Sequence, residues 1–488
     1  MSGVTGDTPG RQAAGLPVLG AEARFHRAAA EKANDEPLRG IVRRNIDTYF
    51  TALEAGKQRF ADWEAARQRC YEIKWEAVNH LDRYLEQFEE NVKRRGGHVF
   101  WAATAEEARN YVLELVERRG VKTVVKSKSM VTEEVHLNPA LEARGLQVWE
   151  TDLGEYIVQL RHEPPYHILT PAMHLSREQI LELFREKIPD DVQGESNEEL
   201  VAAARRALRR AFFSAEMGIS GANFLVADAG MVAISTNEGN GRLCTSLPPV
   251  HVVLAGIEKV IPRLADLATL WPVLATAGTG QFLTAYSTLI GGARTAEEND
   301  GPREFHVVLL DNGRSRLLAD AEQREVLHCI RCGACLNACP VYRNIGGHAY
   351  GTTYQGPIGS VLTPHLRGLD EYQHLSYASS LCGCCSEICS VKIDLAHHLL
   401  HNRRNAVQRA RKPWAERLAM RLWQWTMLDG RRFRLAGTLG RMALLTPYGA
   451  GAQRTALDPL RAWTEAREAP PLAPVSFHDR WRRGHGKR

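Results

Sequence analysis

Apolar residues recur at intervals of three and four along the first part of the chain. Ile46, Tyr49 and Leu53 follow this spacing, and so do the apolar positions between Trp75 and Leu85. This interval places apolar side chains on one face of a helix, and Pro is almost absent there. The pattern therefore predicts long helices from about residue 22 to residue 95.

Short apolar runs then alternate with helical patterns. Strands are predicted at residues 98–101, 123–126, 147–150, 250–254 and 305–310, and helices at residues 105–119, 176–187 and 197–217. Residues 223–236 predict two strands joined in a hairpin at Ala229-Gly230, and residues 237–242 predict a polar, glycine-rich loop. Such alternation is typical of an open α/β sheet that is mostly parallel.

At 488 residues the chain is too long for one ordinary domain. We predict four regions: a flexible leader at residues 1–20, a helical arm plus α/β domain at 21–312, a cysteine-bearing domain at 313–412, and a basic, Trp-rich C-terminal region at 413–488. The third region lacks strand alternation and runs into a helical pattern, so we expect it to be α-helical.

The end of the chain is basic, whereas the rest is acidic. Residues 401–488 hold 19 Lys and Arg against 6 Asp and Glu, a net charge of +13, and the whole chain carries +5, so the first 400 residues carry −8. Residues 417–428 predict an amphipathic helix with tryptophans beside arginines, which favours peripheral membrane contact or a partner subunit. No nucleic-acid motif is present, so we expect no nucleic-acid partner.

The cysteines are concentrated in one region. Eight of the ten lie between Cys329 and Cys389. No stretch approaches the roughly 20 apolar residues that span a bilayer, and the first residues lack the apolar core of a secretory signal, so we expect a cytoplasmic protein. Because the cytosol is reducing and the thiols are clustered, they predict a metal centre rather than disulfides.

The first cysteine run has the spacing of a bacterial ferredoxin. Cys329, Cys332, Cys335 and Cys339, followed by Pro340, fit C-x2-C-x2-C-x3-C-P without a gap. In such a run the fourth cysteine ligates a second cluster, so the motif predicts a partner run. Structural zinc would explain four of the cysteines but not the two runs together.

The second run is shorter. Cys382, Cys385 and Cys389 fit C-x2-C-x3-C, and the position where a full run would begin is Ser379. We predict two [4Fe-4S] clusters, one held by Cys329, Cys332, Cys335 and Cys389, the other by Cys339, Cys382 and Cys385. The eighth ligand stays open between Cys384, Ser379 and a non-protein ligand. Because Cys384 neighbours Cys385, we expect it to point away as a small buried residue.

Polar residues gather at the strand ends and loops of the predicted sheet. They are Lys126, Ser127, Ser129, Glu133, Glu150, Asp152, Glu238, Asn240, Arg242, His251, Lys259 and Arg294. Ligands of open α/β sheets bind at the carboxyl ends of strands, so these residues are candidates for a small anionic substrate, with Arg242 or Arg294 pairing a carboxylate. They are more typical of helix caps and turns. Five histidines have no ligand spacing, and we expect them to be solvated or on helix surfaces: His348, His365, His374, His397 and His398.

Several ordered blocks resemble a known family. They are Val125–Glu134, Gly218–Asp228, Asn237–Arg242, Leu247–His251, Gly256–Lys259, the two cysteine runs and Ser476–Trp481. Together they are similar to the iron–sulfur B subunit of the lactate-utilisation system. The chain departs from that family at Ser390, where a proline is usual, and at Cys384, where a small residue is usual.

The resemblance implies a fold and a role. It implies a lactate-utilisation-type α/β domain, with a sheet similar to sugar-phosphate isomerases and CoA transferases, followed by a ferredoxin-type domain whose cluster ligands are the seven cysteines. It also implies electron transfer in the oxidation of L-lactate to pyruvate with two other subunits and an unidentified electron acceptor. Two alternatives stay open: the α/β domain itself oxidises a small 2-hydroxy acid, or the chain is a scaffold with degenerate clusters.

Overall fold

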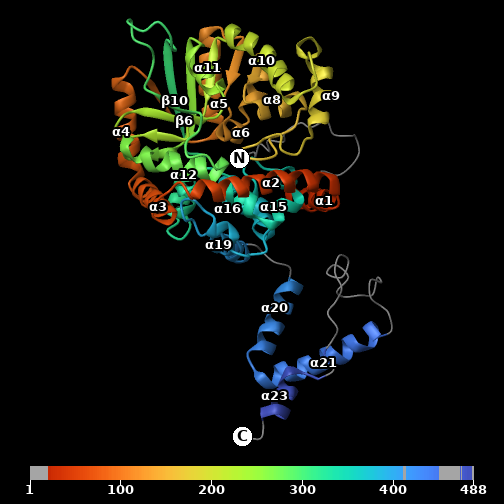
Figure 1. The fold of residues 1–488 in the computed structure, drawn as a ribbon. Coiled ribbons are helices and arrows are strands. Elements are labelled where there is room, and N and C mark those ends of the chain that lie inside the picture. The colour runs from red at the N-terminus through yellow and green to blue at the C-terminus, as the bar shows by residue number, and fades with distance from the viewer. Residues whose placement is uncertain (1–19, 410–413, 450–472, 474, 486–488) are drawn as a thin grey trace. The chain divides into compact units, whose positions relative to one another are not determined.

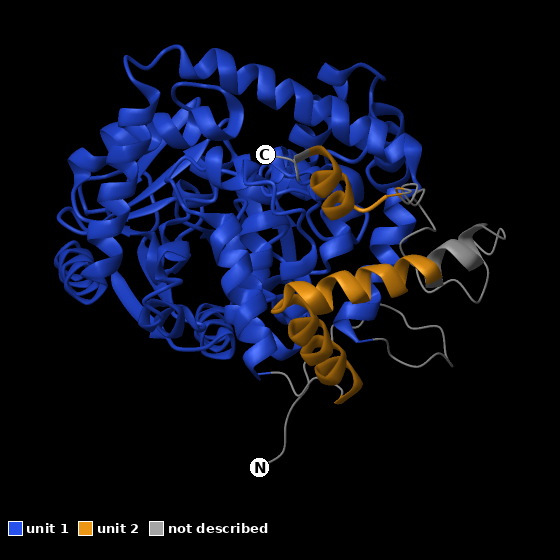
Figure 2. Cartoon of the chain, turned by 90° about the horizontal axis from the view of Figure 1, so that it is seen from below, with its two compact units in different colours: residues 1–409 blue, residues 410–488 orange. Residues whose placement is uncertain are grey.

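The computed structural model describes residues 20–409, 414–449, 473 and 475–485. Residues 1–409 form one compact unit and residues 410–488 a second (Figure 2). The predicted leader, apart from Gly20, lies outside the described residues.

Four helices form the N-terminal arm, as predicted. Asp35 and Asp62 each cap a helix through a carboxylate that accepts a backbone N–H, from Leu38 and Ala65 respectively. The helices are α1 (Ala21–Ala33), α2 (Glu36–Lys57), α3 (Trp63–Asn79) and α4 (Leu81–Arg94).

A six-stranded sheet forms the centre of the α/β region. Its strands, in spatial order, are β1 (His98–Ala102), β10 (Glu304–Leu310), β7 (Val250–Gly256), β4 (Met217–Ser220), β2 (Thr123–Lys126) and β3 (Gln147–Glu150). Every neighbouring pair is parallel, with Val308 opposite Leu254. The predicted open, mostly parallel α/β sheet is confirmed.

Helices cover both faces of this sheet. Leu254 and Val308 belong to a core with α5 (Ala105–Arg119), whereas their neighbours Val253 and Leu309 belong to a core with α4. Successive strand residues point to opposite faces, so a strand buried on both sides is apolar throughout.

The predicted helix at 197–217 is wrong at its end. Helix α10 (Asn197–Ser214) stops at Ser214, and Met217 begins β4 between β2 and β7. All four residues of β4 are buried, so pairing with two neighbouring strands outweighs local helix propensity. The glycine-rich loop is also shorter than predicted, because α11 (Asn240–Ser246) begins inside it.

A second, four-stranded sheet lies beside the first. Its order is β8 (Val260–Ile261), β5 (Phe224–Val226), β6 (Met231–Thr236) and β9 (Tyr286–Ile290). β5 and β6 form the predicted antiparallel hairpin, with Phe224 opposite Ala233. Gly230 in its turn has φ +60, the left-handed region that glycine tolerates best.

The cysteine-bearing segment is built of short helices. The helices are α13 (Arg314–Ala319), α14 (Ala334–Ala338), α15 (Pro340–Ile345), α16 (Gly356–Arg367), α17 (Leu369–Tyr372), α18 (Cys384–Glu387) and α19 (Leu395–Arg409). One hydrophobic core joins them to the arm and to α12 (Leu267–Thr279); it includes Ile46, Leu270 and Leu362. Figure 1 shows α2 and α12 lying between the sheets and this segment. The segment therefore packs as part of the first unit.

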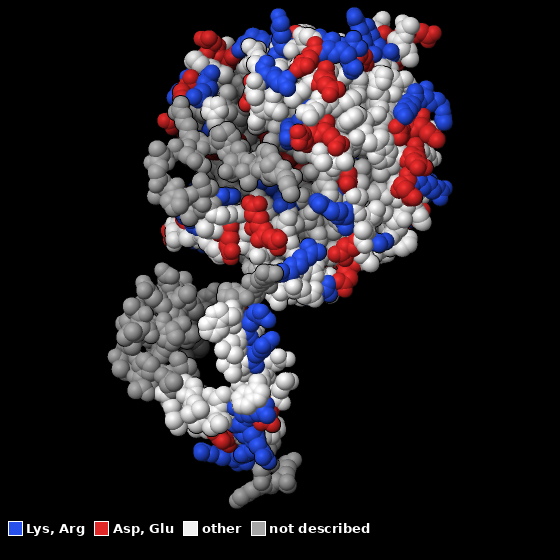
Figure 3. All heavy atoms as spheres, turned by 180° about the vertical axis from the view of Figure 1, so that it is seen from behind, with Lys and Arg blue, Asp and Glu red and all other residues white. Residues whose placement is uncertain are grey.

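The second unit contains α20 (Trp414–Met427), α21 (Gly430–Gly449) and α23 (Phe477–His485). The predicted amphipathic helix at 417–428 is helical up to Met427. None of its residues is buried, and Trp423 and Trp425 are more than half exposed. Lys and Arg outnumber Asp and Glu on the described part of this unit (Figure 3). Among the described helices, none is long and apolar enough to cross a membrane.

Candidate metal centre

Four thiols from the two cysteine runs form a first group. Burial raises the pKa of Cys335, and the neighbouring Cys329, Cys332, Cys389 and Cys385 raise it further. Burial, followed by Cys332, raises the pKa of Cys389 to about 12. The Cys332 sulfur also lies 3.3 Å from the Ser390 hydroxyl oxygen. The last cysteine of the second run therefore lies with the first three of the first run.

A second group of thiols combines Cys339 of the first run with cysteines of the second run. Burial raises the pKa of Cys339, with Cys382 and Cys384 as neighbouring charges. Burial, followed by Cys339, raises the pKa of Cys385 to about 11. Cys339 and Cys385 are buried, whereas Cys382 and Cys384 are exposed. Cys339 of the first run thus lies near thiols of the second run, and this second group reaches the surface at Cys382 and Cys384.

The spacing of the sulfurs does not suit a single zinc ion. Among the described residues, no three cysteine sulfurs lie within 4.8 Å of one another. A tetrahedral zinc with Zn–S bonds of about 2.3 Å needs sulfurs about 3.8 Å apart. The sulfurs of each group are therefore not arranged around one tetrahedral zinc ion.

Arg331 lies against the first group. Its backbone has φ +63, and its N–H donates to the Cys329 sulfur at 3.4 Å. The guanidinium is buried over the ring of Tyr354, 4.7 Å from the centroid, and donates to Glu258 Oε1 at 3.2 Å. Its Nη1 is buried with no hydrogen-bond partner among the described residues. A buried donor without a partner is costly, so Nη1 indicates an acceptor yet to be accounted for.

A buried network links Arg331 to the carboxyl edge of the main sheet. Arg314 donates to Glu258 at 2.5 Å and to both oxygens of Glu134, at 2.9 and 2.7 Å. Burial raises the pKa of Glu258, but Arg314 and Arg331 outweigh it and lower that pKa to about 2. Glu258 is therefore ionised at neutral pH.

Two lysines add positive charge to the same network. Burial and the neighbouring Lys259 lower the pKa of Lys74 to about 7, and burial and Arg331 lower that of Lys259 to about 8. Cationic groups thus outnumber carboxylates around Cys329, a thiol that would be anionic as a cluster ligand.

Comparison with known proteins places this geometry in a family. A sequence model of the LUD domain matches residues 85–310, one of a 4Fe-4S dicluster domain matches 325–393, and one of the C-terminal part of lactate utilisation protein B matches 400–485. Lactate utilization protein B of Bacillus velezensis (strain DSM 23117) is 44% identical over 460 residues, covering 94% of this chain and 96% of its own. That of Bacillus subtilis (strain 168) is 43% identical, covering 93% and 95%.

The chain belongs to the lactate utilisation protein B family. A solved structure of a DUF162 family protein from Deinococcus radiodurans covers 47% of this chain and 98% of its own, at 12% identity and a TM-score of 0.27, which is too low to support an argument. The resemblance predicted from the sequence blocks is confirmed, and the dicluster match gives this family member two [4Fe-4S] clusters.

The residues present fit such clusters. Backbone N–H groups of Arg331 and Ile393 donate to the sulfurs of Cys329 and Cys389, at 3.4 and 3.3 Å. Hydrogen bonds to sulfur are one of the means by which proteins hold and tune iron–sulfur clusters. The unpartnered Nη1 of Arg331 is a further donor for the anionic surface of a cluster in the first group.

The expectation that Cys384 is buried is wrong. Helix α18 begins at Cys384, and the next residue, Cys385, takes the buried side, so Cys384 is left exposed. The neighbouring Cys382 raises the pKa of the Cys384 thiol. Ser379, the other candidate ligand, accepts the N–H of Leu381 at 3.1 Å on its hydroxyl oxygen.

Most of the candidate substrate residues have structural partners in this family member. The Lys126 amine is fully buried and donates to Glu150 at 2.5 Å, Asn138 at 2.6 Å and Glu133 at 3.4 Å, which uses all three of its protons. Burial lowers the pKa of Lys126, but Glu150 and Glu133 outweigh it and raise that pKa. Lys126 has no proton left for a substrate.

The remaining candidates are distributed among several contacts. Ser129 caps α6 (Met130–Glu134), Asp152 caps α8 (Leu153–Leu160), and Asn240 begins α11. Ser127 donates its backbone N–H to Ile219, Glu238 accepts the N–H of Leu153, and Arg294 donates to the Asn299 carbonyl. Arg242 lies over the Tyr286 ring, His251 bonds with Ser220, and Lys259 joins the network beside Cys329. The cap and turn interpretation therefore holds for Ser129 and Asp152.

The histidines are not all solvated. His374 and His398 are buried, and His398 bonds with Glu325 at 2.9 Å, whereas His397 is exposed. His348 is half-buried and lies beside Glu163 and His174. Sequence spacing missed this group because His348 is far along the chain from the other two residues.

Proposed function

We propose that this chain is the iron–sulfur electron-transfer subunit of a complex that oxidises L-lactate to pyruvate and so allows growth on lactate. The observation that carries the proposal is the pair of thiol groups, one partly buried beside Arg331 and Glu258 and one reaching the surface at Cys382. The name of the curated relatives, lactate utilization protein B, supports the substrate.

Within this proposal, Cys329, Cys332, Cys335 and Cys389 hold the first cluster, and Cys339, Cys382 and Cys385 belong to the second. The exchange of one cysteine between the runs supports this division. We assign the eighth position to Cys384, because its thiol adjoins that of Cys382 while the Ser379 hydroxyl is already hydrogen-bonded.

Two clusters that each carry one electron match the two electrons that the reaction releases. Oxidation of lactate to pyruvate releases two electrons and two protons, and a [4Fe-4S] cluster when bound carries one electron at a time. The seven thiolates named above would hold the two clusters, the burial of Cys335 and Cys389 would limit the access of water to the first, and Arg331 and its cationic neighbours would lie beside it. The exposed second group is the natural exit toward an acceptor outside the chain, which the sequence and structure leave unidentified.

The test is anaerobic electron paramagnetic resonance (EPR) of the full chain with L-lactate. Cluster reduction only after the other subunits are added would support the proposal. Reduction of the isolated chain by lactate would favour the alternative in which the α/β domain itself oxidises a 2-hydroxy acid. No reduction in either sample, with iron present, would leave the scaffold alternative.

Three finer assignments accompany this proposal. We propose that the α/β domain shares the fold of sugar-phosphate isomerases and CoA transferases, which its open parallel sheet with helices on both faces supports. The exposed tryptophans and basic charge of α20 support a docking surface for the other subunits or a membrane face. The clustered thiols are consistent with a reducing, cytoplasmic location.

A further inference from the structure

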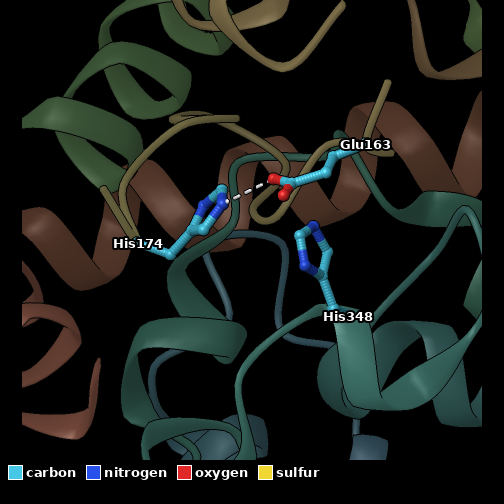
Figure 4. A group of neighbouring side chains, drawn as sticks. All are labelled: Glu163, His174 and His348. Carbon is cyan, nitrogen blue, oxygen red and sulfur yellow. Dashed lines mark hydrogen bonds and ion pairs between the residues drawn. The ribbon is translucent and has the colours of Figure 1, made fainter. Parts of the chain in front are cut away.

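Three ligand-type side chains meet outside the thiol groups. Glu163 and His174 lie between α8 and α9 (Arg177–Lys187), and His348 begins a short 3-10 helix in the cysteine-bearing segment, His348–Tyr350. One ligand atom of each lies within 4.8 Å of the other two. Figure 4 shows the two imidazoles and the carboxylate facing a common space. None of the residues proposed above as a cluster ligand takes part.

The hydrogen bond of His348 determines which of its nitrogens is free. Nε2 lies 2.8 Å from the carbonyl oxygen of Pro164. A carbonyl only accepts, so Nε2 carries the proton and Nδ1 of the neutral ring keeps its lone pair. A histidine that donates one N–H to a backbone carbonyl and offers its other nitrogen is the usual arrangement of a metal ligand.

Packing fixes the ring of His174. Its Nε2 lies 3.0 Å from Glu163 Oε2. The ring stacks on Tyr166 with centroids 4.5 Å apart and planes 20° apart. Tyr166 is buried, and its carbonyl accepts the hydroxyl of Tyr342 at 2.7 Å. The side chain of His174 is only 9% exposed, so its position is set by the surrounding structure.

The two oxygens of Glu163 have different partners. Arg161 donates to Oε1 at 2.8 Å, which leaves Oε2 directed at His174. The carboxylate is 28% exposed, so water can reach the group. Two ligand atoms of a tetrahedral metal with bonds of about 2.1 Å lie about 3.4 Å apart. Glu163 Oε2 and His174 Nε2 are 3.0 Å apart, which is close to that distance.

We propose that Glu163, His174 and His348 bind a divalent transition-metal ion such as zinc, with water in the remaining position. Two imidazoles and one carboxylate are ligands that zinc favours. The ion would connect the loop before α9 to the cysteine-bearing segment, next to Tyr342 in α15. Its role is to fasten these two parts of the first unit together.

The test uses the full chain, purified without oxygen and loaded with its clusters, and zinc as the probe. Metal analysis with chelator competition measures zinc affinity, and X-ray absorption at the zinc edge identifies the ligands. We expect one tight zinc with a shell of nitrogen and oxygen at about 2.0–2.1 Å. Glu163→Gln and His348→Asn are each expected to weaken binding at least about tenfold while iron content stays unchanged.

The control is a second histidine pair on the surface. His397 and His401 lie one turn apart on α19 with ring centroids 4.1 Å apart, a spacing that can also capture zinc. The variant His397→Asn with His401→Asn should keep the tight zinc. Equal affinity in wild type and His348→Asn would overturn the proposal, as would absence of tight zinc. A shell with sulfur at about 2.3 Å would also overturn it, because the zinc would then be at the cysteines. Glu163→Gln keeps the size and shape of the side chain, so its zinc affinity tests the proposal even if a histidine variant fails to fold.

Discussion

At the scale of single residues, the candidate metal centre contains cysteines that their spacing predicts and charged side chains that this spacing does not predict. Arg331 lies between two cysteines of the first run, and its guanidinium reaches Glu258, at the end of a strand of the main sheet. The position of a thiol in a run predicts its group, whereas the charge around it depends on partners far along the chain.

Replacing Arg331 with Gln should lower the reduction potential of the first cluster. A buried positive charge stabilises the more negative, reduced form, so its removal favours the oxidised form. Potentiometric titration followed by EPR measures the shift, and Arg331→Lys, which keeps the charge, should shift less. Arg343→Gln is the control, because Arg343 pairs with Asp47. Equal potentials in wild type and Arg331→Gln would refute the assignment of this role.

Replacing Cys384 with Ala should convert the second cluster to a three-iron form. If Cys384 completes that cluster, its loss leaves one iron without a protein ligand, and that iron dissociates on mild oxidation. Iron analysis and the EPR signal of a three-iron cluster measure the change. Ser379→Ala should keep both clusters intact; the opposite result would assign the eighth position to Ser379.

At the scale of elements, strand pairing overrides local preference where the chain passes through the centre of the sheet. The helical pattern continues past Ser214, yet Met217 begins β4. Gly218 in this strand passes so close to α11 that a Cβ would lie 1.8 Å from the carbonyl oxygen of Cys244. Neither constraint is visible in a local window of sequence.

Gly218→Ala should therefore destabilise the fold. The added methyl collides with backbone, which cannot rotate away, and overpacking of this kind costs about 1–3 kcal/mol. Gly40→Ala is a matched control, because nothing lies within 4 Å of its Cβ position in α2, and it should stabilise by roughly 0.5–1 kcal/mol. Denaturant unfolding of both variants measures the difference; similar stabilities would contradict the close contact.

At the scale of the whole molecule, the α/β sheet and the cysteine-bearing segment share one compact unit. Glu258 follows β7 in the sheet, Arg314 begins α13, and Arg331 belongs to the first cysteine run, and the three side chains join in one buried network. The second unit, residues 410–488, is separate. The stability of the first unit and the binding of partners by the second can therefore be tested in separate experiments.

Glu258→Gln should destabilise the first unit by about 3–5 kcal/mol at pH 7, because it leaves the buried guanidinium of Arg331 without its carboxylate and leaves Arg314 with Glu134 alone. The pKa of Glu258 is lowered to about 2 from its ordinary value of 4.5. Its contribution is thus fully present above pH 4.5 and lost as pH falls toward 2. Unfolding free energies of wild type should fall in that window more steeply than those of the variant; parallel profiles would argue against the ion pairs.

Removing residues 413–488 should leave both clusters intact and abolish co-purification with the other subunits. The clusters are predicted to lie in the first unit, whereas the exposed tryptophans of α20 and the excess positive charge lie in the second. Iron content and EPR check the clusters, and affinity capture of the partners checks docking. Continued co-purification would move the docking surface to the first unit.

The sequence by itself determined the alternation of strands and helices, the hairpin at Gly230, and the kind of metal centre. These features depend on local spacing, such as the intervals among Cys329, Cys332 and Cys335, or on periodic burial along one element. The family resemblance also followed from ordered blocks of sequence, and the comparisons bear it out.

Only the tertiary structure decided which distant residues meet. It exposed Cys384, joined Arg331 to Glu258, and placed His348 beside Glu163 and His174. Such contacts arise when separate elements pack into one core, and their energy depends on burial and on partners that no local pattern specifies.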